Sequence, residues 1–175
     1  MRLMRVMFTR SAFLLLILTG TLLLNGCASQ PPMPEEQTYH APASHTGSVA
    51  YIRGTKIEDH RVFYDDHFAY VLMIDGKFVR NPDKDWDQPL ALTPGSHLIA
   101  VEYKLSVFRA RYSFRINIKP GVTYAVKINP GVAGPDERRY CDFSILDATT
   151  GTPVTEVRRS NVSGGVKTAN FRPID

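Results

Sequence analysis

The segment from Glu58 to His67 gathers side chains that can bind a metal ion. It contains His60 and His67 together with four carboxylates. Imidazole and carboxylate groups are zinc ligands only when they converge on one point. The two histidines are seven residues apart, a spacing that aligns them only on a helix, and the stretch has no helical pattern. We predict a charged connecting loop without metal or cofactor, and retain both histidines as candidate contacts for a small ligand.

A second acidic cluster runs from Asp83 to Asp87, and alternating aspartates can supply oxygen ligands to Ca²⁺. An EF-hand loop beginning at Asp83 needs Gly at its sixth position and Glu at its twelfth, which are Gln88 and Pro94 here. The pattern therefore predicts an ordinary solvated loop. Within it, Trp86 is either a plug that closes one end of the fold or an exposed platform for a partner or glycan.

Nucleophilic catalysis requires a Ser or Cys beside a base and an orienting third group. The chain contains no G-x-S-x-G, no glycine loop for phosphate at a helix start and no H-E-x-x-H. Cys141 alternates with Phe143 and Ile145, which predicts a small buried core residue rather than a reactive thiol. We predict a protein that is not an enzyme, with a hydrolase of dispersed active site as the weakest alternative.

Four cations stand at outward positions of three amphipathic segments: Lys104, Arg111, Arg115 and Lys127. If the three segments pair in sequence order, the cations share one surface patch. Such a patch is either a solvated face that discourages edge aggregation or a contact for anionic headgroups or a polyanionic envelope polymer.

The elements that must position these residues are short alternating segments separated by turn signals, which is typical of an all-β domain. We predict a single antiparallel β-sandwich of about seven to eight strands. The segments expected as strands are Ser48–Arg53, Ala69–Ile74, Lys77–Arg80, His97–Leu105, Ala110–Ile118, Val122–Ile128, Tyr140–Leu146 and Pro153–Val157, and Pro89–Leu92 is a further candidate for a short strand.

The clearest of these strands is Ala110–Ile118. Its even-numbered positions from Tyr112 to Ile118 are apolar, whereas its odd-numbered positions from Arg111 to Asn117 are polar. Alternation of period two places the apolar side chains on one face of a half-buried sheet. Lys119-Pro120-Gly121 is expected to be a tight turn that pairs this strand with Val122–Ile128.

The start of the chain is a secretory signal in its layout, with three arginines followed by an apolar run from Ala12 to Leu24. This run is shorter than the roughly 20 apolar residues of a transmembrane helix. Leu24-Asn25-Gly26-Cys27 resembles the lipobox of bacterial lipoproteins. The resemblance implies cleavage before Cys27 and lipidation of that residue; Ala28 and Ser29 after it favour the outer membrane, with the domain facing the periplasm.

These observations divide the chain into a signal peptide (1–26), a lipidated Cys27 with a proline-rich flexible tether (27–47), a sandwich domain (48–158) and a loose tail (159–175). The full chain has 21 basic and 17 acidic side chains. Residues 1–26 hold three Arg and no acid, so their removal leaves 18 basic side chains against 17 acidic ones. A mature chain this close to neutrality gives no support for nucleic acid as a partner.

A second resemblance covers residues 70–128. The succession Ile74-Asp75-Gly76, then Leu92-Thr93-Pro94-Gly95-Ser96-His97, then Gly121-Val122-Thr123-Tyr124 is similar to small β-sandwiches of the PEGA and carboxypeptidase-regulatory-like types. It is also similar to uncharacterised bacterial envelope lipoproteins. The resemblance implies a sandwich that recognises or spaces, without catalytic residues.

Together the patterns predict a membrane-anchored lipoprotein that acts as a non-enzymatic binding or envelope-assembly module with an envelope protein or polymer as partner. The alternative is a small-ligand or glycan-binding sandwich that uses the loops with His60, His67 and Trp86. The oligomeric state is left open by the sequence.

Overall fold

The computed structural model describes residues 34–42, 49–58, 66–134 and 138–164. The predicted strands that contain Phe114 and Cys141 are present. One 3₁₀ turn, η2, covers Glu35–Gln37. The strands of the described chain are β1 (Ala50–Arg53), β2 (Thr55–Ile57), β3 (His67–Ile74), β4 (Lys77–Phe78), β5 (Leu90–Leu92), β6 (Gly95–Leu105), β7 (Phe108–Ile118), β8 (Thr123–Ala133), β9 (Arg138–Asp147) and β10 (Arg158–Asn161).

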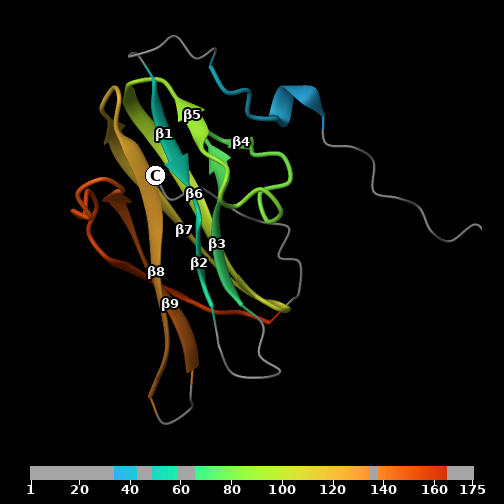
Figure 1. Ribbon diagram of the computed structural model, residues 1–175. Helices are drawn as coiled ribbons and strands as arrows, with labels where there is room; N and C mark the ends of the chain where they lie inside the picture. Colours follow the sequence, from blue (N-terminus) through green and yellow to red (C-terminus); the bar gives the residue numbers. More distant parts are fainter. Residues whose placement is uncertain (1–33, 43–48, 59–65, 135–137, 165–175) are drawn as a thin grey trace, which may run out of the picture. The chain divides into compact units, whose positions relative to one another are not determined.

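Two sheets form the sandwich, which confirms the predicted fold class (Figure 1). The first has the order β10-β9-β8-β1-β5, and the second has the order β2-β3-β6-β7 with β4 added to β3. All pairings between these strands are antiparallel except that of β1 with β8, which is parallel.

The core lies between the two sheets and is built from the predicted alternation. Ile99, Val101 and Tyr103 of β6 face Phe114 and Ile116 of β7 on the buried side. The opposite sheet contributes buried side chains from β1, β8 and β9, namely Ala50, Ile52, Tyr124, Val126, Ile128, Cys141, Phe143 and Ile145. Burial of a large apolar side chain contributes about 1.5–3 kcal/mol, so this two-sided layer is the main stabilising element.

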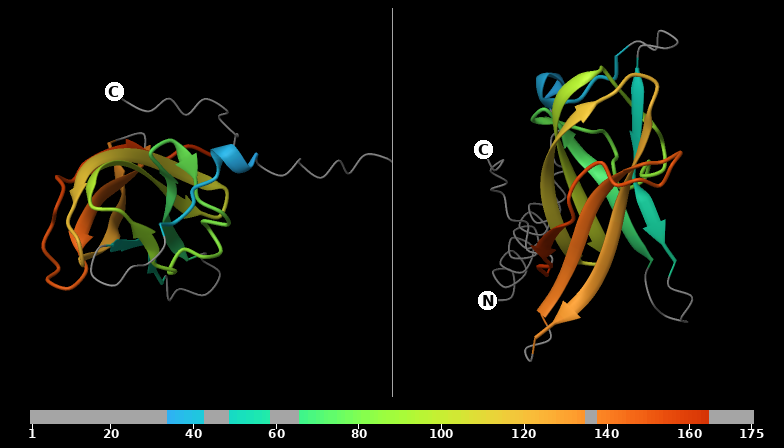
Figure 2. Two further views of the ribbon diagram at one scale, coloured as in Figure 1. Left: turned by 90° about the horizontal axis from the view of Figure 1, so that it is seen from above. Right: turned by 90° about the vertical axis from the view of Figure 1, so that its left-hand side faces the viewer.

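The two sheets are connected along both sides (Figure 2). On one side the chain passes from β1 to β2 through Gly54, whose N–H donates to the carbonyl of Trp86 at 2.7 Å. A Cβ at Gly54 would lie 2.2 Å from the carbonyl oxygen of Ala69, so only glycine fits there. On the other side Arg109 and Ser163 exchange two backbone hydrogen bonds, at 2.9 and 2.8 Å.

The hairpin of β6 and β7 is the longest regular element of the second sheet, with eleven residues in each strand. Leu105 pairs with Phe108 across a two-residue turn in which Ser106 has a φ of 51°. Two-residue hairpin turns take positive φ because that twist matches the strands. This hairpin positions the predicted cations Lys104, Arg111 and Arg115.

The expected pairing of β7 with β8 is wrong. β7 ends the second sheet, whereas β8 lies inside the first, so Lys119-Pro120-Gly121 carries the chain from one sheet to the other. Both strands have one apolar face, and those faces are buried equally whether the strands pair in one sheet or lie in two opposed sheets. Alternation fixes which face is buried, but it does not fix the partner strand.

The predicted limits of the domain also need correction. Tyr39, placed in the tether, donates its backbone N–H to Phe78 and its hydroxyl to Ala91, both at 2.7 Å, and Thr38 beside it is buried. At the other end, β10 lies in the expected tail and pairs with β9. Residues 153–157 form only a bridge from Pro153 to Leu146 instead of a strand. Within that tail, residues 166–171 are a further candidate for an edge strand by sequence, and they lie outside the described residues.

Candidate binding surface

Three of the four predicted cations lie on one face. In the β6–β7 register Lys104 is opposite Arg109, Glu102 is opposite Arg111, and Leu98 is opposite Arg115. These positions share the outward side of the hairpin, because alternate residues of paired strands face the same way. Lys127 is on β8 in the other sheet, so the prediction that all four cations form one patch is wrong.

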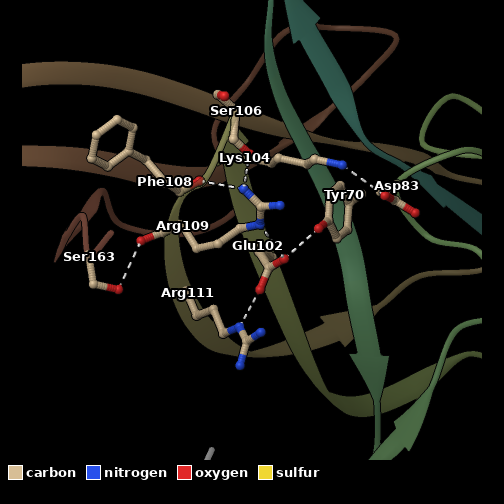
Figure 3. Close-up of polar contacts among 9 residues, drawn as sticks. All are labelled: Tyr70, Asp83, Glu102, Lys104, Ser106, Phe108, Arg109, Arg111 and Ser163. Atoms are coloured by element: carbon tan, nitrogen blue, oxygen red, sulfur yellow. Dashed lines mark hydrogen bonds and ion pairs between the residues drawn. The ribbon is translucent and has the colours of Figure 1, made fainter. Parts of the chain in front are cut away.

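Glu102 is the centre of this outward face, although it is only 4% exposed. Its carboxylate accepts hydrogen bonds from the hydroxyl of Tyr70 and from Nε of Arg111, and Nε of Arg109 lies 3.5 Å away (Figure 3). A buried carboxylate is tolerated when donors of this kind surround it. Burial and the neighbouring carboxylate raise the pKa of Tyr70 well above its usual range.

The cations of the face are therefore largely compensated. Lys104 donates to Asp83 at 2.9 Å, and this hydrogen bond lowers the pKa of the Asp83 carboxyl. The guanidinium of Arg109 also donates to the carbonyls of Ser106 and Phe108, at 2.5 and 2.8 Å, and so caps the hairpin turn. Lys104, Arg109 and Arg111 act first as structural partners of the acids that they contact.

Arg115 differs from these residues. It is exposed on β7, and no ion pair connects it to any residue in the described ranges. The strand on which it stands is the edge of its sheet. The backbone of Arg109 points away from β6 toward Ser163, so period-two geometry also turns the backbone groups of Arg111, Ser113, Arg115 and Asn117 away from β6.

Two contiguous depressions follow this edge, with volumes of about 350 and 280 Å³. We call them together the β7 groove. One wall is β7 from Tyr112 to Asn117, and the other is formed by Asp147, Val154, Thr155, Glu156 and Arg158. Both depressions include Arg115 and Val154, which places the free cation at the middle of the groove.

Ser113 lines the same groove and carries the one buried side-chain oxygen that has no hydrogen-bond partner among the residues described. An unsatisfied buried hydroxyl costs about 1–3 kcal/mol. Strand β7 is therefore not optimised for stability at this position.

Of the residues predicted as one ligand site, His67 and Trp86 do not come together. His67 points to the core side of β3, with its Nδ1 2.8 Å from the hydroxyl of Tyr103. Phe68, the next residue, points outward and packs against Trp86 with ring centroids 6.0 Å apart. Trp86 and His67 therefore lie on opposite faces of β3. His60 lies outside the described residues.

One set of side chains resembles a catalytic triad in composition only. His97 Nδ1 lies 2.6 Å from Asp75, and His97 Nε2 lies 3.3 Å from the hydroxyl of Thr93. However, Nε2 is closer to the carbonyl oxygen of Thr93, at 2.8 Å, and a carbonyl only accepts. Nε2 must donate to that carbonyl, so it cannot take a proton from the hydroxyl in this arrangement.

Cys141 is fully buried, and burial raises the pKa of its thiol to about 12. A thiol with such a pKa is a poor nucleophile at neutral pH, because the thiolate is the reactive form. Within the described ranges, no group of three or more His, Cys, Asp or Glu is arranged to hold a metal ion.

Sequence reasoning missed the features that define this surface. No sequence signal marks Glu102 as the centre of this face, whereas the alternation of Arg109 with Arg111 would place Arg109 on it. The free edge of β7 could not be found, because it depends on which sheet β8 joins. Cys27 lies outside the described residues.

Comparison with protein-family models, with curated proteins and with solved structures finds no match to this chain. Within the described ranges, no helix combines the length and the apolar character that a membrane crossing requires.

Proposed function

We propose that this chain is a lipid-anchored envelope lipoprotein whose β-sandwich is a non-enzymatic binding module, and that it contacts its partner through the β7 groove. The observation that carries the proposal is that Ser113, Arg115 and Asn117 have no backbone partner among the described residues at this sheet edge, beside a groove centred on Arg115, which has no ion pair with any described residue. Long free edges are a liability that proteins normally cover, and a partner strand or polymer is one way to cover them.

Binding is favoured over catalysis by the state of the reactive groups. The nitrogens of His97 face Asp75 and a carbonyl oxygen, and the Cys141 thiol is buried with a raised pKa. The separation of Trp86 from His67 removes the main support for the small-ligand alternative.

The anchor is supported by the Leu24-Asn25-Gly26-Cys27 motif and the apolar run before it. Acyl chains contribute about 0.8 kcal/mol per buried CH₂, and more than one chain is needed for stable attachment. A lipidated Cys27 would therefore hold the domain at the envelope, with the outer membrane favoured and the sandwich in the periplasm.

The anchor is tested by Cys27→Ser in cells that produce the full chain. We expect loss of processing and of acyl labelling, while Cys141→Ser, as matched control, retains both. Unchanged processing and labelling in Cys27→Ser would contradict the lipoprotein assignment.

The binding surface is tested by placing a photo-crosslinking amino acid at Asn117 in the β7 groove or at Lys127 on the other sheet. Both side chains are exposed, so both can react with a bound molecule. We expect an adduct of defined mass in intact cells from position 117 only. No adduct at 117, or the same adduct at both positions, contradicts the proposal.

A further inference from the structure

The free edge of β7 offers backbone hydrogen bonds in the pattern that an extended peptide requires. No described residue supplies a backbone partner to Ser113, Arg115 or Asn117 on the side away from β6. The wall from Tyr112 to Asn117 contains six strand residues, and six residues of strand span roughly 20 Å. Peptides commonly bind such an edge by adding one strand to the sheet.

The charge of the groove favours an acidic peptide. Arg115 and Lys119 have no ion pair with any described residue. Of the two acids of the wall, Glu156 pairs with Arg158, whereas Asp147 accepts the N–H groups of Thr149 and Thr150 and keeps its negative charge. Arg115 and Lys119 together still outweigh Asp147. The charge that remains uncompensated is positive.

In the register centred on Ser113, a second copy of this chain fits the edge poorly. Antiparallel pairing of two β7 strands about Ser113 would place Arg111 of each copy opposite Arg115 of the other. Like charges directly opposite each other in a sheet are destabilising.

The described end of the same chain, at Ser163 and Gly164, does not enter the groove. Ser163 pairs antiparallel with Arg109, and a Cβ on Gly164 would already lie 3.9 Å from the Phe108 ring. The chain at this point runs toward the hairpin turn, which is the direction away from the groove.

We infer that the β7 groove binds an acidic, extended segment of a partner protein, which adds to β7 as a further strand. This inference rests on the proposed binding function and names the chemistry of its partner. Backbone hydrogen bonds to β7 supply the alignment, and carboxylates placed near Arg115 and Lys119 supply the charge complement.

The test begins with a displayed library of random octapeptides, selected on the full chain in detergent micelles and counter-selected on Arg115→Glu. We expect enriched peptides that carry Asp or Glu at alternate positions and lack Pro, with at least tenfold weaker binding to Arg115→Glu. Lys127→Glu makes the same charge change on the other sheet and should bind as the unchanged protein does. The inference is overturned if no peptide is enriched over the Arg115→Glu variant, or if the enriched peptides are basic or rich in proline.

The backbone contact is tested on the best peptide, made with N-methyl groups on one or the other alternate set of amides. Addition to a strand uses only one set, so one methylated peptide should lose at least tenfold in affinity and the other should not. Equal losses would indicate contact through charge alone, as with a polyanion, and overturn the inference. A crosslink at position 117 would in that case still support the proposed function, so the two failures are distinguishable.

Discussion

Asp75 and His97 join two turns at the same end of the sandwich. The carboxylate of Asp75 lies 2.6 Å from Nδ1 of His97 and accepts the backbone N–H of Leu98 at 2.8 Å. His97 is in turn bonded through Nε2 to the carbonyl of Thr93, at 2.8 Å. The turn after β3 is thereby fixed to the turn before β6.

We therefore expect His97→Ala to destabilise the fold by about 0.5–1.5 kcal/mol, because it removes the imidazole hydrogen bonds to the carbonyl of Thr93 and to the carboxylate of Asp75. Thr93→Val is the matched control. It removes only the 3.3 Å hydroxyl contact and keeps the carbonyl, so its effect should be smaller than about 0.5 kcal/mol. Urea unfolding of both variants measures the difference, and equal losses would contradict the role of the imidazole.

The outward face of β6 and β7 gives a second prediction. Arg111→Met removes a donor from the buried carboxylate of Glu102 and should cost about 1–3 kcal/mol of unfolding free energy. Arg115→Met makes the same change four residues further along β7, at an exposed position without an ion pair to any described residue. That control should stay within about 0.5 kcal/mol. A comparable loss in both variants would show that strand propensity, rather than Glu102, determines the result.

The sequence predicts the features of this structure that depend on neighbouring residues, but not those that depend on which distant segments pair. Alternation in Ala110–Ile118 correctly assigns its buried face, since side-chain direction is a local property of a strand. The partner of that strand is a non-local property, and the turn at Pro120-Gly121 can either form a hairpin or cross between sheets. Because strand pairing is non-local, the sequence predicts one cation patch for Lys127 and Arg111 and one ligand site for Trp86 and His67, although the structure separates both pairs.

Cys141 gives a prediction about pH. In the Cys27→Ser variant, Cys141 is the only thiol of the chain. Burial raises its pKa to about 12, whereas an unfolded cysteine titrates near about 8.5. The folded state therefore retains the proton, and the stability this contributes is complete below about pH 8.5 and declines as the pH rises toward the folded pKa.

Labelling of that thiol by a maleimide should accordingly be slow in the folded protein at pH 8 and fast in urea. Cys141→Ala should also lose less stability than the parent between pH 8 and pH 10, since it has no thiol to ionise. Rapid labelling of the native protein at pH 8 would show that Cys141 is accessible and that its thiol is not held in the core.

Most substitutions lower the free energy of unfolding, but a substitution of Ser113 should raise it. Its buried hydroxyl has no partner among the described residues, so Ser113→Ala should raise the free energy of unfolding by up to about 1 kcal/mol. Thr155→Val, across the groove, removes an oxygen that accepts the N–H of Ile145 at 2.9 Å, and it should lower stability by a similar amount. Thermal unfolding of the two variants tests the contrast directly. Destabilisation by Ser113→Ala would mean that the hydroxyl already has a partner, and that the edge of β7 is satisfied at this position without any bound molecule.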